Sequence, residues 1–153
     1  MDFATHGIRF TYPDSWTLND ESNEEKVHIT VQSPGSAFWS LIAFHEDVSS
    51  EQLLDLVETA YRDDYPSADI YPQTTLEGPF GETRQARIEF VCLDLIANVT
   101  ALAFHTSHQS VMVLTQSADI EEESVAPLFA AMTASLEFDE TEESTWVDDL
   151  FSP

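Results

Sequence analysis

The stretch ETRQARIEFVCLDLIANVTALAFHTSHQSVMVLTQ, residues 82–116, decides the fold of this chain. Residues 82–94 alternate between apolar and polar side chains, which is typical of a half-buried strand. Residues 95–104 form a long, mostly apolar run, and residues 109–116 form a third apolar segment. Three such segments with short connections predict consecutive antiparallel strands.

Shorter segments nearer the N-terminus also have the pattern of strands, namely residues 3–12, 16–18, 27–32 and 38–44. The sequence SPGS separates the last two, so residues 27–32 and 37–45 are predicted to form a hairpin. Residues 69–77 are predicted to be an edge strand, because Pro72 has no backbone N–H to donate to a neighbouring strand.

A helix is predicted over residues 50–64. Ser49 and Gln52 have the spacing of a capping box, and Pro66 stops the helix after its last turn. The apolar face is predicted to contain Leu53, Leu56, Val57, Ala60 and Tyr61.

A second helix is predicted within residues 119–136. We expect it to start near Ser124, because Pro127 then falls in the first turn, where no backbone donor is lost. Its apolar positions are Val125, Leu128, Phe129, Met132 and Leu136.

The order of elements is strands, a helix, a run of strands and a second helix. This order predicts an α+β domain with an antiparallel sheet flanked by helices. The chain has 153 residues, of which 42% are hydrophobic, enough for one core of ordinary density. We expect a single domain over residues 1–138 and an acidic C-terminal tail over residues 139–153.

Charge is the strongest compositional feature. The chain has 29 acidic residues against 5 Lys and Arg, for a net charge of −24. Nucleic acids and anionic membranes are excluded as expected partners, because both are recognised through clustered Lys and Arg. Three interpretations stay open: a surface that favours solubility, adaptation to a salty cytoplasm, or a surface that attracts a basic protein partner.

The cytoplasm is the expected location. The N-terminus, MDFATHGIRF, has neither the basic start nor the apolar segment of a secretory signal. The single cysteine, Cys92, excludes an internal disulfide and lies in an apolar run. We therefore expect Cys92 to pack as a small hydrophobic residue.

Three histidines, His45, His105 and His108, are candidate metal ligands. A two-residue turn at Thr106-Ser107 would place His105 and His108 opposite each other, and His45 ends another strand. The favoured interpretation is that these are exposed turn residues, since zinc needs three or four ligands. No motif for catalysis or for phosphate binding occurs, so no catalytic residue, metal or cofactor is predicted.

The C-terminal tail contains a short apolar stripe. Trp146, Val147, Leu150 and Phe151 would lie on one face of a helix, flanked by acidic residues. This stripe either docks on its own domain or binds a partner or a second protomer. These four residues are the predicted partner-binding site.

The segment GIRFTYPDSW, residues 7–16, resembles the opening of PsbP-like and Mog-type proteins, in which an early strand runs into a Tyr-Pro turn followed by Trp. The resemblance continues through residues 111–115, 127–129 and 134–138. It implies an α/β/α sandwich and identifies the chain as a bacterial member. The superfamily includes a photosystem II subunit, a Ran-binding regulator and effector-associated chaperones, and it implies no catalytic residue.

The resemblance favours a non-enzymatic protein-binding or assembly module. We expect a basic protein partner, a chaperone-adaptor role as its concrete form, and a homodimer. The alternative is a small-ligand-binding protein or enzyme with a pocket between the helix at 50–64 and the sheet. A metal-binding module at His45, His105 and His108 is the third hypothesis.

Overall fold

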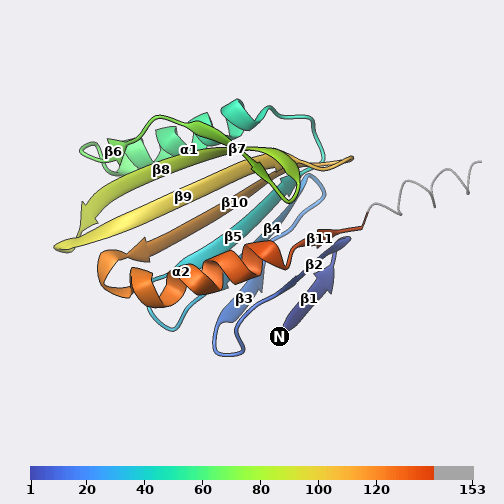
Figure 1. The fold of residues 1–153 in the computed structure, drawn as a ribbon, viewed down its shortest axis with the longest axis horizontal. Coiled ribbons are helices and arrows are strands. Elements are labelled where there is room, and N and C mark those ends of the chain that lie inside the picture. Colours follow the sequence, from blue (N-terminus) through green and yellow to red (C-terminus); the bar gives the residue numbers. More distant parts are fainter. Residues whose placement is uncertain (140–153) are drawn as a thin grey trace, which may run out of the picture.

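A computed structural model describes residues 1–139, which form two antiparallel sheets and two helices (Figure 1). The large sheet is eight-stranded, with the order β3-β4-β5-β10-β9-β8-β6, and β7 also pairs with β8. Its strands are β3 (Thr17–Asp20), β4 (Lys26–Gln32), β5 (Phe38–Phe44), β6 (Asp69–Ile70), β7 (Thr74–Gly78), β8 (Gly81–Cys92), β9 (Leu95–His105) and β10 (Ser110–Ala118). The hairpin predicted from residues 27–32 and 37–45 and the series in residues 82–116 are confirmed.

The strand predicted over residues 3–12 is wrong. The chain forms a hairpin there, β1 (Asp2–Thr5) and β2 (Ile8–Thr11), which joins β11 (Glu137–Phe138) in a small second sheet. His6 and Gly7 both adopt left-handed backbone angles, with φ of 59° and 74°. Two consecutive residues of this kind make a tight hairpin turn, which reverses the chain.

Helix α1 (Ser50–Asp64) begins with the predicted capping box, since the Ser49 hydroxyl accepts a hydrogen bond from the Gln52 amide at 3.1 Å. Its buried face differs from the prediction. Leu54 is buried in place of Leu56, which is 64% exposed. Both leucines fit helical spacing, and contact with β8 and β9 decides which one is covered.

Helix α2 (Asp119–Ala134) begins five residues before the predicted start at Ser124. Pro127 consequently lies in the helix interior rather than in the first turn. The Glu121 carboxylate accepts a hydrogen bond from the Ala118 backbone at 3.1 Å and so caps the earlier start. Of the predicted apolar positions, Leu128 is exposed, and the others are buried.

The two helices pack against alternate sets of residues along β9. Ala97, Val99, Ala101 and Ala103 form a cluster with α1, and Leu102 and Phe104 pack in a cluster with α2. Because successive residues of a strand point to opposite faces, the helices lie against opposite faces of the large sheet (Figure 1). The α1 cluster centres on β8 and β9, and the α2 cluster centres on β4, β5 and β10.

The fold is therefore α+β, built mostly of antiparallel sheet with two helices. The edge segment predicted over residues 69–77 is split at Pro72 into β6 and β7. Within residues 1–139, no helix has the length and apolar composition required to cross a bilayer. The tail residues Trp146, Val147, Leu150 and Phe151 lie outside the described residues.

Candidate functional site

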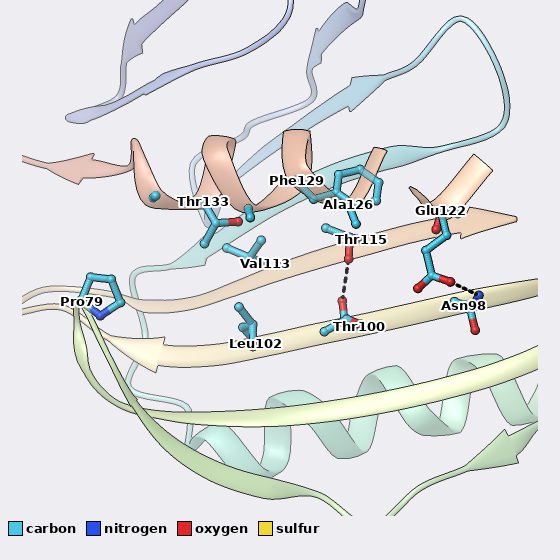
Figure 2. A pocket seen from close by; sticks show the side chains of 13 residues that line it. Pro79, Asn98, Thr100, Leu102, Val113, Thr115, Glu122, Ala126, Phe129 and Thr133 are labelled. Carbon is cyan, nitrogen blue, oxygen red and sulfur yellow. Dashed lines mark hydrogen bonds between the residues drawn. The ribbon is translucent and has the colours of Figure 1, made fainter. Parts of the chain in front are cut away.

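A pocket of about 410 Å³ lies between α2 and the large sheet (Figure 2). We call it the α2 pocket. Its lining residues are Pro79, Asn98, Thr100, Leu102, Val113, Thr115, Ser117, Glu122, Ala126, Phe129, Ala130, Thr133 and Ala134. This volume is in the range of sites that bind small molecules or short peptide segments.

The floor of the α2 pocket comes from β9 and β10. Asn98, Thr100 and Leu102 are alternate residues of β9, so they share one face, and Val113 pairs with Leu102 across the strands. Thr115 pairs with Thr100, and its hydroxyl donates a hydrogen bond to the Thr100 carbonyl oxygen at 3.5 Å (Figure 2). Polar side chains thus occupy a sheet face that is partly covered by a helix.

The wall of the pocket is one face of α2. Ala126, Ala130 and Ala134 recur every four residues, so small side chains lie one above the other along the helix. These alanines leave space that larger residues would fill. Phe129 and Thr133 complete the wall, and the Thr133 hydroxyl accepts a hydrogen bond from the Trp39 indole at 3.0 Å.

The two ends of the pocket differ in chemistry. At one end the Asn98 side-chain amide donates a hydrogen bond to Glu122 Oε2 at 3.2 Å, which links the sheet to the first turns of α2 (Figure 2). At the other end Pro79 lines the pocket beside Phe80, whose ring stacks on Phe104 at 4.6 Å between centroids. One end is therefore acidic and polar, and the other is apolar.

Glu122 is the one ionisable side chain among the described residues that line the pocket. The remaining polar groups are the hydroxyls and amide of Asn98, Thr100, Thr115, Ser117 and Thr133. General acid–base catalysis needs a proton donor or acceptor matched to a reacting group, and nucleophilic catalysis needs an adjacent base. The lining offers hydrogen bonds, apolar surface and one negative charge, which suit binding.

A second polar cluster lies on β8 and its edge. The Arg87 guanidinium lies 5.6 Å from the centre of the Tyr71 ring. A hydrogen bond to Glu89 raises the pKa of Tyr71, and partial desolvation adds to this effect. Tyr71 is exposed, so this cluster is a surface hydrogen bond and ring contact rather than a buried reactive site.

The alternative hypothesis placed a pocket between the helix at 50–64 and the sheet, and there the described side chains of α1 pack against β8. Leu53, Leu54 and Val57 of α1 are buried against Ala86 and Ile88 of β8. The alternation of β8 places small and branched residues under α1. The α2 pocket lies on the other face of the sheet.

The histidine pair is also placed differently. His105 pairs with Ser110 rather than with His108, because the turn spans residues 106–109. The Thr106 hydroxyl accepts hydrogen bonds from the His108 and Gln109 backbones at 3.4 Å and 3.1 Å, which stabilises this longer turn. His105 Nε2 lies 2.7 Å from the Val48 carbonyl oxygen.

No group of three His, Cys, Asp or Glu side chains suited to a metal ion occurs within the part of the chain that the structure describes. His45 is exposed just after the end of β5. Cys92 is half-buried and packs at the edge of the α1 cluster, as expected.

Sequence reasoning missed the α2 pocket entirely. Thr100 and Thr115 have the pattern of solvent-facing strand residues, and nothing local shows that α2 crosses above them. The four-residue spacing of Ala126, Ala130 and Ala134 was the one available signal, because alanine along one helical face permits either close packing or an open space.

No family model matches this chain, and no curated protein matches it in sequence. Solved structures do match in fold. The solution structure of cyanobacterial PsbP (CyanoP) from Synechocystis sp. PCC 6803 aligns with a TM-score of 0.67 at 12% sequence identity, covering 90% of this chain and 91% of that chain.

LpqN of Mycobacterium tuberculosis, described as involved in cell envelope biogenesis, aligns with a TM-score of 0.52 at 14% identity, covering 86% of this chain and 83% of that chain. At these identities the likeness concerns the fold. The chain has a PsbP-like fold, and the resemblance drawn from residues 7–16 is confirmed at that level.

Proposed function

We propose that this domain is a non-enzymatic binding module that holds an extended segment of a protein partner in the α2 pocket. The observation that carries the proposal is the lining itself, which combines hydroxyls, an amide and apolar surface with a single ionisable group, Glu122. Such a lining can bind and orient a chain but has no paired acid and base to act on it.

The shape of the pocket supports a peptide segment. Asn98, Thr100 and Leu102 follow one another at every second residue of β9, so the floor runs for about 14 Å at roughly 3.4 Å per residue. An extended segment of about four residues has this length. The side-chain hydroxyls along the floor could pair with the backbone groups of such a segment.

Electrostatics supports a basic partner. The net charge of −24 attracts cations over a long range at low salt, and Glu122 places one carboxylate at the polar end of the pocket. A Lys or Arg of the partner would meet Glu122, and the apolar end near Pro79 would take an uncharged residue. A chaperone-adaptor that shields such a segment in the cytoplasm is the concrete form of the proposal.

The test fills the pocket and leaves the rest of α2 unchanged. Ala130→Phe places a ring in the pocket, and Ala131→Phe is the matched control, because Ala131 is an exposed neighbour that does not line the pocket. Binding of a short extended peptide with alternating Lys and Val is measured by calorimetry, and the same peptide with Glu for Lys is the charge control.

We expect the Lys peptide to bind, Ala130→Phe to weaken it by about tenfold or more, and Ala131→Phe to leave it unchanged. Equal binding by the two variants would disprove the proposal. The volume of the pocket also favours a second candidate, a small organic ligand. A thermal shift by a small molecule that Ala130→Phe abolishes, with neither peptide binding, would select that candidate.

A further inference from the structure

The turn between β8 and β9 extends beyond the neighbouring strands. Strands β8 and β9 pair as far as Cys92 and Leu95, but β10 ends at Ala118 opposite Ala97, and β6 begins at Asp69 opposite Glu89. Among the described strands, residues 91–96 therefore pair only with one another. We call residues 91–96 the β8–β9 tip, which forms the left-hand end of the sheet in Figure 1.

The β8–β9 tip is apolar and exposed. Leu93 is 91% exposed, Val91 is 68% exposed and Ile96 is 43% exposed. Val91 and Ile96 are directly paired, so their side chains lie next to each other on one face of the hairpin. Exposed apolar residues that gather in this way mark an interaction site more often than isolated ones do.

The two faces of the tip are covered unequally. On the α1 face, the Tyr65 ring stacks on Phe90 with centroids 3.9 Å apart, and Cys92 packs beside them. Val91 and Ile96 point to the opposite face, the face of the α2 pocket, because they alternate with Phe90 and Cys92. Within residues 1–139, Val91 and Ile96 on that face remain 68% and 43% exposed.

Backbone geometry gives an independent observation. Leu93 and Asp94 both have left-handed backbone angles, with φ of 52° and 64°. A turn with two such residues favours Asn, Asp and Gly, whereas the Cβ of leucine is crowded in this conformation. A leucine at position 93 is therefore unfavourable both for the left-handed backbone and for contact with water. Neither the stability of the fold nor the solubility of the protein accounts for a leucine at this position.

Acidic residues surround the tip. Asp94 is part of the turn, and Glu89 lies two residues before Val91. Asp119, Glu122 and Glu123 begin α2 at the same end of the molecule, since Ala118 pairs with Ala97 and Glu122 bonds Asn98 (Figure 1). An apolar centre with an acidic border is complementary to an apolar depression bordered by Lys and Arg.

The acidic border favours one of three possible occupants of this surface, which are a second copy of the chain, a membrane and a basic protein. A second copy would bring the same carboxylates together across a symmetric interface, at an electrostatic cost. A membrane would have to bury Asp94, which lies beside Leu93 in the turn. A basic protein partner would neither bring like charges together nor bury Asp94 in lipid.

We propose that the β8–β9 tip is a docking surface for a protein partner, with Leu93, Val91 and Ile96 inserting into an apolar depression bordered by basic residues. This surface is separate from the α2 pocket, and the proposal holds whether or not the pocket takes a peptide segment. The tip lies beyond Asn98 along β9, so one partner could contact both.

The test uses a matched pair of exposed leucines. Leu93→Ser removes the apolar side chain of the tip, and Leu56→Ser removes a leucine that is 64% exposed on α1. The probe is a synthetic helical peptide with Leu on one face bordered by Lys, and its binding is measured by calorimetry at low salt. Val91→Ser repeats the test in case one variant is unstable, and Ala130→Phe reports separately on the α2 pocket.

We expect Leu93→Ser and Val91→Ser to weaken peptide binding by about tenfold or more, with Leu56→Ser and Ala130→Phe unchanged. Equal loss in the two leucine variants, or no binding by the parent protein, overturns the proposal. Binding to phosphatidylcholine vesicles that depends on Leu93 overturns it in favour of a membrane. A dimer by sedimentation that Leu93→Ser dissociates overturns it in favour of a second copy.

Discussion

The indole nitrogen of Trp39, on β5, donates a hydrogen bond to the Thr133 hydroxyl of α2 at 3.0 Å. Trp39 is fully buried, and Thr133 lines the α2 pocket. This contact joins the core of the sheet to the wall of the pocket.

Thr133→Val is expected to destabilise the protein, because it leaves the buried indole N–H without an acceptor while keeping the shape of the side chain. An unsatisfied buried donor of this kind lowers the free energy of unfolding by about 1–3 kcal/mol. Thermal unfolding should show a lower midpoint, and Thr133→Ser should restore it. An unchanged midpoint in Thr133→Val would mean that the indole has another acceptor.

Pro127→Ala is expected to stabilise the protein. Pro127 lies in the interior of α2, is exposed, and has no N–H for the helical hydrogen bond that its position calls for. Replacement restores this bond and should raise the free energy of unfolding by about 1–3 kcal/mol, measured by urea denaturation. A loss of stability would show that the proline ring makes a contact that outweighs the missing bond.

Leu93→Asn is expected to raise stability, because asparagine tolerates the left-handed backbone better than leucine does. The gain should be about 0.5–1 kcal/mol, or roughly 1–4 °C in the unfolding midpoint. Leu93→Ala is the control, since it shortens the side chain but keeps a Cβ of the same unfavourable kind. Equal unfolding midpoints for Leu93→Asn and Leu93→Ala would show that backbone strain at this position does not lower stability.

Charge reversals at the two ends of α1 should have opposite effects. Asp64 is the last residue of the helix, where a negative charge opposes the helix dipole, and Glu51 is in the first turn, where it is favourable. Asp64→Lys should therefore raise the free energy of unfolding and Glu51→Lys should lower it, each by about 0.3–1 kcal/mol at low salt. Both variants reduce the net negative charge equally, so a gain in both would indicate general repulsion instead.

Tyr61 should make the fold sensitive to alkali. Burial raises its pKa well above the ordinary 10.0, and the nearby Tyr65 and Asp64 add to this shift. Its hydroxyl donates a hydrogen bond to Gln116 at 2.7 Å. Because the folded pKa is raised, the stability that the neutral form contributes is complete below pH 10 and is lost as pH rises further.

We expect the free energy of unfolding of the parent protein to fall above about pH 10, and Tyr61→Phe to fall less steeply. Absorbance of tyrosinate during the titration would show Tyr61 ionising after the exposed Tyr71. Parallel pH profiles for the two proteins would contradict the assignment.

Periodicity predicted the large sheet well, because alternation over residues 82–94 and the apolar run after it depend only on which faces are buried. It failed where a short turn interrupts the pattern. In residues 3–12, Ile8 and Phe10 alternate as in a single strand, and the reversal at His6 and Gly7 has no effect on that alternation. The start of α2 was missed because Glu121, rather than a Ser or Thr side chain, supplies the cap.

The candidate site could not be predicted, because it depends on how distant elements meet. Leu54 and Leu56 both fit the apolar stripe of α1, and the position of the sheet decides between them. In the same way, Thr100 and Thr115 become a pocket floor only because α2 crosses above them. The exposure of Leu93 was equally hidden, since a leucine in an apolar run is expected to be buried.

The hydrogen bond between Trp39 and Thr133 makes the Trp39 indole an intrinsic fluorescence probe of the α2 pocket. The emission of a buried indole depends on the group that its N–H contacts, and here that group belongs to the lining of the α2 pocket. A ligand in the pocket that forms a hydrogen bond with the Thr133 hydroxyl would therefore shift the emission wavelength of Trp39, and no attached dye is needed.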